Sequence, residues 1–238
     1  MKTVLTSTAF ALMASTAMAD TITLYTSQPN ADAQQTVDAF MAANPDTEVE
    51  WVRDGTTQLL ARLRAEIEAG SPQPDVLLIA DTVTLEGMAQ EGLLSAYQSP
   101  EAENYDAALY SPDGYYYSTK LITTGIIYNT GAETAPTSWA DLVEPGMEGM
   151  VAMPSPLYSG AALIHLATLT GHDSLGWDYY ESLAANEARA QGGNGGTFQA
   201  VASGEKPYGM VVDFLTIRNK ADGSPVEFVF PEEGVSYV

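Results

Sequence analysis

Short apolar segments of strand character alternate with amphipathic helical segments, and this alternation limits the possible folds more than any other feature. Thr21–Tyr25, Thr47–Val52 and Val76–Ile79 have strand character, and apolar residues at helical spacing lie between them. The continuous apolar run at Val76–Ile79 is typical of a strand buried on both faces. This β-α-β-α-β-α opening predicts an α/β unit with a mostly parallel sheet.

A second alternation follows a passage rich in Tyr and Pro at residues 97–115. Its predicted strands are Met150–Met153, Tyr208–Val212 and Val226–Phe230, with helical segments between them. Extended segments near Tyr116–Tyr128 connect the two alternations. The sequence therefore predicts two α/β lobes joined through this region.

The N-terminus has the pattern of a secretory signal peptide at residues 1–19. Lys2 supplies the positive charge, Val4–Met13 is apolar, and Ala17–Ala19 is a small-x-small cleavage site, so the mature chain is expected to begin at Asp20. The chain has no cysteine, which excludes a lipid anchor at the cleavage point and any disulfide. We therefore expect a free, monomeric periplasmic protein.

The composition is strongly acidic. Thirty-one acidic and nine basic residues give a net charge of −22, although only 17% of residues are charged. Binding to nucleic acid or to anionic membranes needs clustered Lys and Arg, and the sequence has no such cluster. The charge excludes these partners without identifying a ligand.

Catalytic signatures are sparse. The two histidines, His165 and His172, have no acidic residue at the spacing of a triad or a metal site. Ser159 is the only nucleophile that pairs with His165 in the sequence, and a separation of six residues puts the two on different faces of a helix. We therefore expect neither an enzyme nor a cofactor nor a bound metal, with a secreted hydrolase as the remote alternative.

Three predicted helices begin with small or hydroxyl-bearing residues. The three starts are Ser159-Gly160-Ala161, Gly55-Thr56-Thr57 and Asn194-Gly195-Gly196. Free backbone N–H groups and the helix dipole make such starts suitable for binding an anion, although each start alone is also explained as a helix cap. Together, at the carboxyl ends of strands, they favour a shared anion site.

Several segments, in this order and spacing, resemble the type II extracytoplasmic solute-binding proteins of ABC transporters. The resemblance is to the branch that contains ferric-ion, thiamine, phosphonate and sugar-phosphate receptors. It is carried by Ile22–Ser27, Gly55–Leu63, Pro74–Leu78, Thr124–Thr130 and Pro154–Ala162. It implies a two-lobed clamp that closes on a solute and docks on a membrane permease. It also implies that residues 20–122 and 226–238 form the first lobe and residues 123–225 the second.

The same resemblance bears on the ligand. Ferric members carry a tandem tyrosine where this chain has Asp213-Phe214, and often a histidine where it has Ser27-Gln28. We therefore expect a small phosphonate or phosphoryl-type anion, with an atypical ferric receptor as the alternative and a sensor role left open. The expected ligand-binding residues are Thr26, Ser27, Thr56, Thr57, Asp81, Ser159, Gly160, Ala161, Asn194, Gly195 and Asp213.

Members of this family usually continue beyond the position that matches Val238. The resemblance thus implies that a C-terminal part of the fold is missing, and that apolar surface is exposed on the first lobe.

Overall fold

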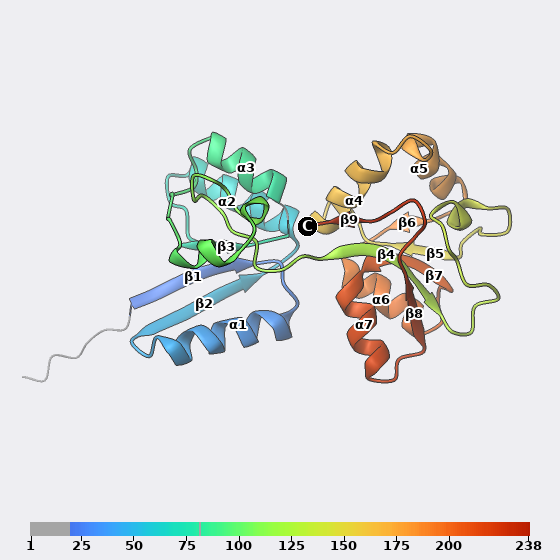
Figure 1. Cartoon of the computed structure of the whole chain (residues 1–238), viewed down its shortest axis with the longest axis horizontal. Helices are drawn as coiled ribbons and strands as arrows, with labels where there is room; N and C mark the ends of the chain where they lie inside the picture. Colours follow the sequence, from blue (N-terminus) through green and yellow to red (C-terminus); the bar gives the residue numbers. More distant parts are fainter. Residues whose placement is uncertain (1–19, 81) are drawn as a thin grey trace, which may run out of the picture.

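The computed structural model describes residues 20–80 and 82–238 and has two lobes joined by a narrow waist (Figure 1). The predicted signal peptide lies outside the described residues. None of the described helices has the length and apolarity needed to cross a membrane.

The first lobe (residues 20–90) is built from three β-α units. Its elements are β1 (Asp20–Thr26), α1 (Asn30–Ala43), β2 (Thr47–Arg53), α2 (Thr56–Glu68), β3 (Val76–Leu78) and α3 (Thr82–Gln90). The strands form a sheet in the order β2-β1-β3, and both pairings are parallel. The predicted parallel sheet is confirmed, and all three strands end at the same edge.

β3 differs from its prediction. It lies at an edge of the sheet, and Val76 is 47% exposed, so the strand is not buried on both faces. Val83 in α3 is also exposed. The apolar run at 76–79 indicated a strand correctly, but the pattern alone does not show whether elements cover both faces.

A linking segment (residues 91–122) follows the first lobe. It contains the short 3-10 helices η1 (Pro100–Asn104) and η2 (Ala107–Leu109), and an isolated bridge between Tyr110 and Tyr117. The hydroxyl of Tyr116 donates a hydrogen bond to Glu86 of α3 at 2.8 Å. The segment therefore packs on the first lobe before the chain enters the second.

The second lobe (residues 123–238) contains a larger sheet. Its elements are β4 (Thr123–Asn129), η3 (Ala140–Val143), β5 (Val151–Met153), α4 (Gly160–Thr170), α5 (Gly176–Ala185), β6 (Arg189–Ala190), α6 (Asn194–Ala202), β7 (Tyr208–Val212), α7 (Asp213–Ala221), β8 (Val226–Val229) and β9 (Ser236–Tyr237). The strand order is β6-β5-β7-β4-β8, and β9 also pairs with β4.

Two features of this sheet correct the sequence-based expectations. First, β4 runs antiparallel to β7, β8 and β9, so the sheet is mixed rather than mostly parallel. Second, residues 226–238, which were expected in the first lobe, pair with β4 in the second sheet. β4 is long enough to pair with both terminal strands along one edge, and this pairing holds the end of the chain on the second lobe.

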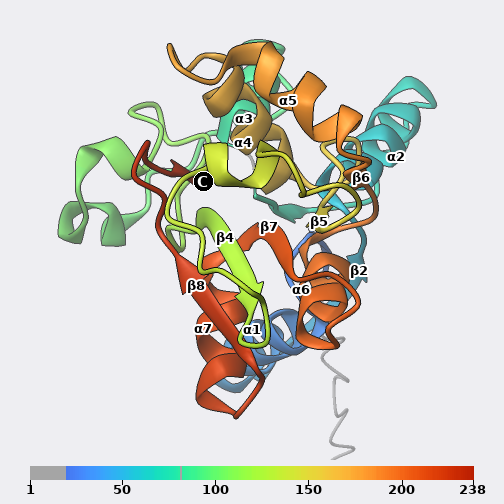
Figure 2. The ribbon, with the colours of Figure 1, turned by 90° about the vertical axis from the view of Figure 1, so that its right-hand side faces the viewer.

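The core of the second lobe lies on both faces of this sheet. α4 and α5 cover one face, and α6 and α7 cover the other (Figure 2). Successive residues of β4 point to opposite faces, so Ile126 packs with Trp139 and Leu183, while Ile127 packs with Phe198 and Val201. Burial on two faces explains why Tyr208–Val212 of β7 reads as a continuous apolar run.

Candidate functional site

A cavity of about 610 Å³ lies between the two lobes and is lined by residues of both lobes and of the linking segment. The walls include the starts of α2 at Gly55 and Thr56, of α4 at Ser159 to Ala161, and of α6 at Gly193 to Gly196. The first amide groups of a helix have no acceptor within the helix. The amides of Gly55 and Gly196 already donate to Asp54 and Gly193. The other amides at these helix starts are the ones suited to binding an anion.

The topology explains why these helix starts meet. β1, β2 and β3 are parallel, so the turns that lead to α1, α2 and α3 leave the same edge of the first sheet. That edge contributes Ser27, Arg53 and Leu78 to the cavity. In the second lobe, the end of β7 contributes Val212 and the start of α7 contributes Phe214.

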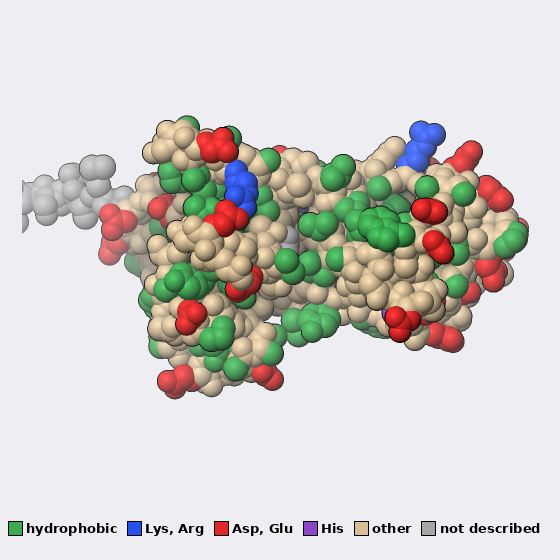
Figure 3. Space-filling view, turned by 90° about the horizontal axis from the view of Figure 1, so that it is seen from above, with side chains coloured by type: hydrophobic (Ala, Val, Ile, Leu, Met, Phe, Trp, Pro, Cys, Tyr) green, Lys and Arg blue, Asp and Glu red, His purple; other side chains and the backbone are tan. Residues whose placement is uncertain are grey.

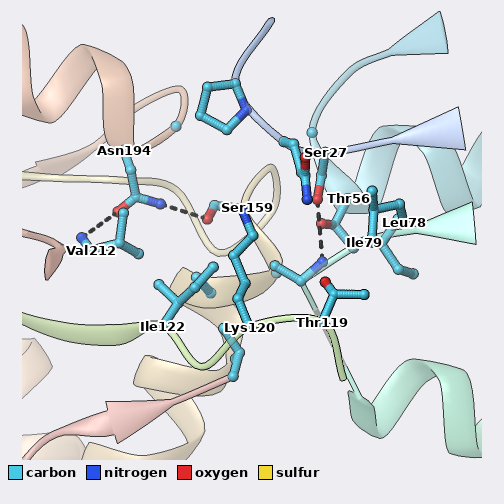
Figure 4. A pocket seen from close by; sticks show the side chains of 18 of the residues that line it. Ser27, Thr56, Leu78, Ile79, Thr119, Lys120, Ile122, Ser159, Asn194 and Val212 are labelled. Carbon is cyan, nitrogen blue, oxygen red and sulfur yellow. Dashed lines mark hydrogen bonds between the residues drawn. The ribbon is translucent and has the colours of Figure 1, made fainter. Parts of the chain in front are cut away.

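A hydrogen-bond chain fixes the wall of the second lobe (Figure 4). The backbone N–H of Val212 donates to Oδ1 of Asn194 at 3.2 Å, so the amide nitrogen of Asn194 must face the other way. That nitrogen donates to Oγ of Ser159 at 3.0 Å, and the backbone N–H of Ala162 donates to the same oxygen at 3.2 Å. A hydroxyl oxygen accepts two bonds and donates one. The proton of Ser159 is thus left to donate into the cavity.

The wall of the first lobe is built around Ser27 and Thr56. Oγ of Ser27 accepts a hydrogen bond from the backbone N–H of Ala80 at 3.2 Å (Figure 4). Thr56 is the first residue of α2 and is almost completely buried. Both hydroxyl side chains lie across the cavity from Asn194 and Ser159 in this view.

Seven of the expected ligand-binding residues line the cavity. They are Ser27, Thr56, Ser159, Gly160, Ala161, Asn194 and Gly195. Asp81 lies outside the described residues.

Three expected residues have other roles. Thr26 is fully buried, and its hydroxyl donates to the carbonyl of Leu78 at 3.1 Å. Thr57 does not line the cavity, and its backbone N–H donates across the lobes to Tyr158 at 3.4 Å. The carboxylate of Asp213 accepts a hydrogen bond from Thr123 and one from the N–H of Phe214, both at 2.7 Å. Asp213 therefore stabilises the start of α7 instead of facing a solute.

Two basic residues of the cavity were missed. Arg53 is the last residue of β2, and Lys120 lies in the linking segment. The position of Arg53 at the carboxyl end of a predicted strand was a signal for the site. Lys120 had no such signal, because it follows an irregular passage. Acidic side chains are spread over both lobes and basic ones are few (Figure 3). The cavity, with two basic side chains, therefore differs in charge from the surface around it.

The lobes touch directly at Tyr158. Its hydroxyl accepts a hydrogen bond from Arg53 at 3.1 Å, and the neighbouring carbonyl of Leu157 accepts one from Gln58 at 3.1 Å. Two glycines also lie against the backbone of the opposite lobe. A Cβ atom at Gly160 would lie 2.2 Å from the carbonyl oxygen of Ala80, and one at Gly55 would lie 2.4 Å from that of Tyr158.

His165 takes part in a different cluster. Its Nδ1 lies 3.1 Å from Oγ of Ser236, and its ring centroid lies 4.6 Å from that of Trp139. Burial lowers the pKa of His165 to about 3, so the side chain is neutral. Since Ser159 bonds to Asn194 and Ala162, the hydrolase alternative has no assembled nucleophile and base at this pair. Among the described residues, no group of three His, Asp or Glu side chains could hold a metal ion.

The comparisons with known proteins agree with this architecture. A family model described as "Bacterial extracellular solute-binding protein" matches residues 71–237. A curated relative from Haemophilus influenzae, itself described as an uncharacterized protein, is 25% identical over 228 residues. That match covers 91% of this chain and 65% of the relative, so the chain spans less than two thirds of the relative's length.

The fold is similar to several solved structures. The periplasmic binding protein AfuA from Actinobacillus pleuropneumoniae, with exogenous fructose-6-phosphate bound, has a TM-score of 0.79 at 24% identity, covering 92% of this chain and 71% of AfuA. Iron-bound HitA from Pseudomonas aeruginosa has a TM-score of 0.76 at 22% identity, covering 92% and 73%. Because the family model covers the linking segment and every strand of the second sheet, the chain belongs to the bacterial extracellular solute-binding proteins.

Proposed function

We propose that this protein is a periplasmic receptor that binds a small phosphoryl or phosphonate anion between its lobes and delivers it to an ABC permease. The observation that carries the proposal is the convergence of helix starts from both lobes on one cavity. Helix N-termini stabilise negative charge, and Ser159 adds a hydroxyl donor that has no acceptor in its own network. The bound fructose-6-phosphate of AfuA is consistent with this ligand class.

A ferric ion would need other donors. Tyr116, Tyr117 and Tyr158 line the cavity, but each hydroxyl has a partner in the protein. Burial raises the pKa of Tyr116, and the hydrogen bond to Glu86 raises it further, so formation of the phenolate is disfavoured. The residues of the cavity therefore favour an anion over a cation.

A calorimetric and thermal-shift screen tests the proposal. The solutes are inorganic phosphate, 2-aminoethylphosphonate, fructose 6-phosphate, thiamine and a ferric salt, with neutral fructose as the control. A phosphoryl or phosphonate solute at a hundred times its Kd should stabilise the protein by about 2.7 kcal/mol. Stabilisation by the ferric salt alone would contradict the proposal and favour the ferric alternative.

The permease is the proposed partner, and a sensor role would use the same clamp. Uptake of the solute in cells with and without the cognate permease separates the two. Loss of uptake with the permease deleted supports delivery, while unchanged uptake with a lost signalling response contradicts it.

A further inference from the structure

The ammonium group of Lys120 lies at the cavity, and its hydrogen-bond donors have no acceptor in the part of the chain that the structure describes. Its side chain extends from the linking segment into the cavity, towards the side where Ser159 lies (Figure 4). Among the described residues, its contacts are Oδ2 of Asp32 at 3.6 Å and the ring of Phe214, 5.9 Å from the centroid. Both contacts are longer than a hydrogen bond, so all three N–H donors remain available.

Arg53, the other basic residue of the cavity, uses two of its five N–H donors on neutral acceptors of the two walls. Its Nε donates to the carbonyl of Gln28 at 3.1 Å, and one terminal nitrogen donates to the hydroxyl of Tyr158 at 3.1 Å. These bonds hold the guanidinium between the walls of the two lobes. Arg53 is therefore fixed by both walls and keeps its charge, whereas Lys120 is the cation whose three N–H donors are all open to a solute.

Asp32 holds this ammonium group from outside the cavity. It lies in the first turn of α1, and its side chain is 14% exposed. Oδ1 accepts a hydrogen bond from Arg218 of α7 at 2.8 Å, while the buried Oδ2 has no hydrogen-bond partner and faces Lys120. One carboxylate thus lies between two cations, and a net positive charge remains beside the cavity.

The same cluster joins the two lobes. Asp32 belongs to the first lobe and Arg218 to the second, and the guanidinium of Arg218 lies over the ring of Phe214 at 5.1 Å from its centroid. Lys120 contacts the same ring. The position of the ammonium group therefore depends on an ion pair that exists only when the lobes are together.

We propose that Lys120 is the specificity-determining residue that pairs with the negative charge of the solute, and that Asp32 is its positioning residue. The inference rests on the proposed function and specifies it further. In a chain of net charge −22, a solute anion is repelled over most of the surface, so a cation with open N–H donors at the site has a large effect on selection.

Isothermal titration with inorganic phosphate and with fructose 6-phosphate tests Lys120. Lys120→Met should weaken the affinity of whichever anion the wild type binds by about tenfold or more, since hydrogen bonds to charged groups are worth about 1.5–3 kcal/mol. Lys120→Arg should retain most of the affinity. Lys220→Met is the matched control, because Lys220 pairs with Glu227 and does not line the cavity.

The two proposals fail in different ways. Binding of neither anion by the wild-type protein would contradict both. Anion binding by the wild type with equal affinity in Lys120→Met would overturn the role of Lys120 and leave the proposed function standing.

Asp32→Asn tests the positioning role. We expect a two- to fivefold loss of affinity, because a partly exposed ion pair contributes up to about 1 kcal/mol. The loss should be smaller when Lys120 is already Met, since Asp32 acts in part through Lys120. Additive losses, or tighter binding in Asp32→Asn, would show that Asp32 does not position the ammonium group. Thermal unfolding of each variant verifies that the fold is intact.

Discussion

At the scale of single residues, the pairing of hydrogen-bond donors with acceptors fixes the orientation of the side chains in the site. The N–H of Val212 orients the amide of Asn194, and Asn194 and Ala162 together occupy the oxygen of Ser159. A serine in this state offers a proton and no lone pair to the cavity. At Ser159 the wall therefore offers a hydrogen-bond donor, which suits the proposed phosphoryl or phosphonate solute.

The variant Ser159→Ala tests whether the hydroxyl of Ser159 donates to the solute. Removing the hydroxyl deletes one donor to a charged solute, so affinity for the bound anion should fall about tenfold or more. Ser159 is also the N-cap of α4, so the free energy of unfolding should fall by about 1 kcal/mol. Ser99→Ala is the control, because Ser99 caps η1 and does not line the cavity. Equal affinity in wild type and Ser159→Ala would remove Ser159 from the site.

At the scale of elements, the boundaries followed the sequence closely where helices and strands have their own signals. Tyr208–Val212 has the predicted limits, and Met150–Met153 and Val226–Phe230 each differ from the observed strand by one residue. The strands β6 and β9, of two residues each, were missed, because two residues carry no periodicity. β9 is defined by its pairing with β4 and by the contact between Ser236 and His165 of α4.

The link between α4 and β9 should make stability depend on pH. Burial lowers the pKa of His165 to about 3, while in the unfolded chain the side chain has the ordinary histidine pKa of 6.5. Between these values the unfolded state binds a proton that the native state does not, so acid favours unfolding. The contribution of neutral, buried His165 to the free energy of unfolding is fully present above about pH 6.5. Below that pH the free energy of unfolding falls by about 1.4 kcal/mol per pH unit.

Urea unfolding between pH 7 and pH 4 measures this effect against a variant. His165→Asn keeps a polar group near Ser236 and removes the titration, so its stability should fall less steeply with acid than that of the wild type. Its stability at pH 7 should be lower because a smaller side chain leaves space beside Trp139. Parallel pH profiles for the two proteins would show that His165 does not cause the dependence.

At the scale of the whole molecule, the two lobes meet through surfaces that tolerate no added atoms at two points. Gly160 of the second lobe faces the carbonyl of Ala80, and Gly55 of the first faces the carbonyl of Tyr158. A backbone carbonyl within a packed lobe cannot move aside as the end of a flexible side chain can. Glycine at these positions therefore permits the contact between lobes that closes the cavity.

Gly160→Ala should force the lobes apart while leaving each lobe folded. The added Cβ would lie 2.2 Å from a backbone oxygen, so the lobes must separate to relieve the overlap. Small-angle scattering should give a larger radius of gyration for the variant, and anion affinity should fall. Gly55→Ala should have the same effect from the other lobe.

Gly87→Ala is the control for both variants, because no atom lies within 4 Å of the added Cβ. Replacing this glycine within α3 should stabilise the protein by about 0.5–1 kcal/mol. An unchanged radius of gyration in both Gly160→Ala and Gly55→Ala would contradict the closing role of the glycines.

The sequence by itself determined the α/β class, most element boundaries and seven of the cavity residues, because hydrophobic periodicity and helix-start composition are local properties. Only the tertiary structure decided that Asp213 serves its own helix, that residues 226–238 pair with β4, and that Lys120 reaches the cavity beside Asp32. These features depend on contacts between residues far apart in the chain, and no local pattern records such contacts.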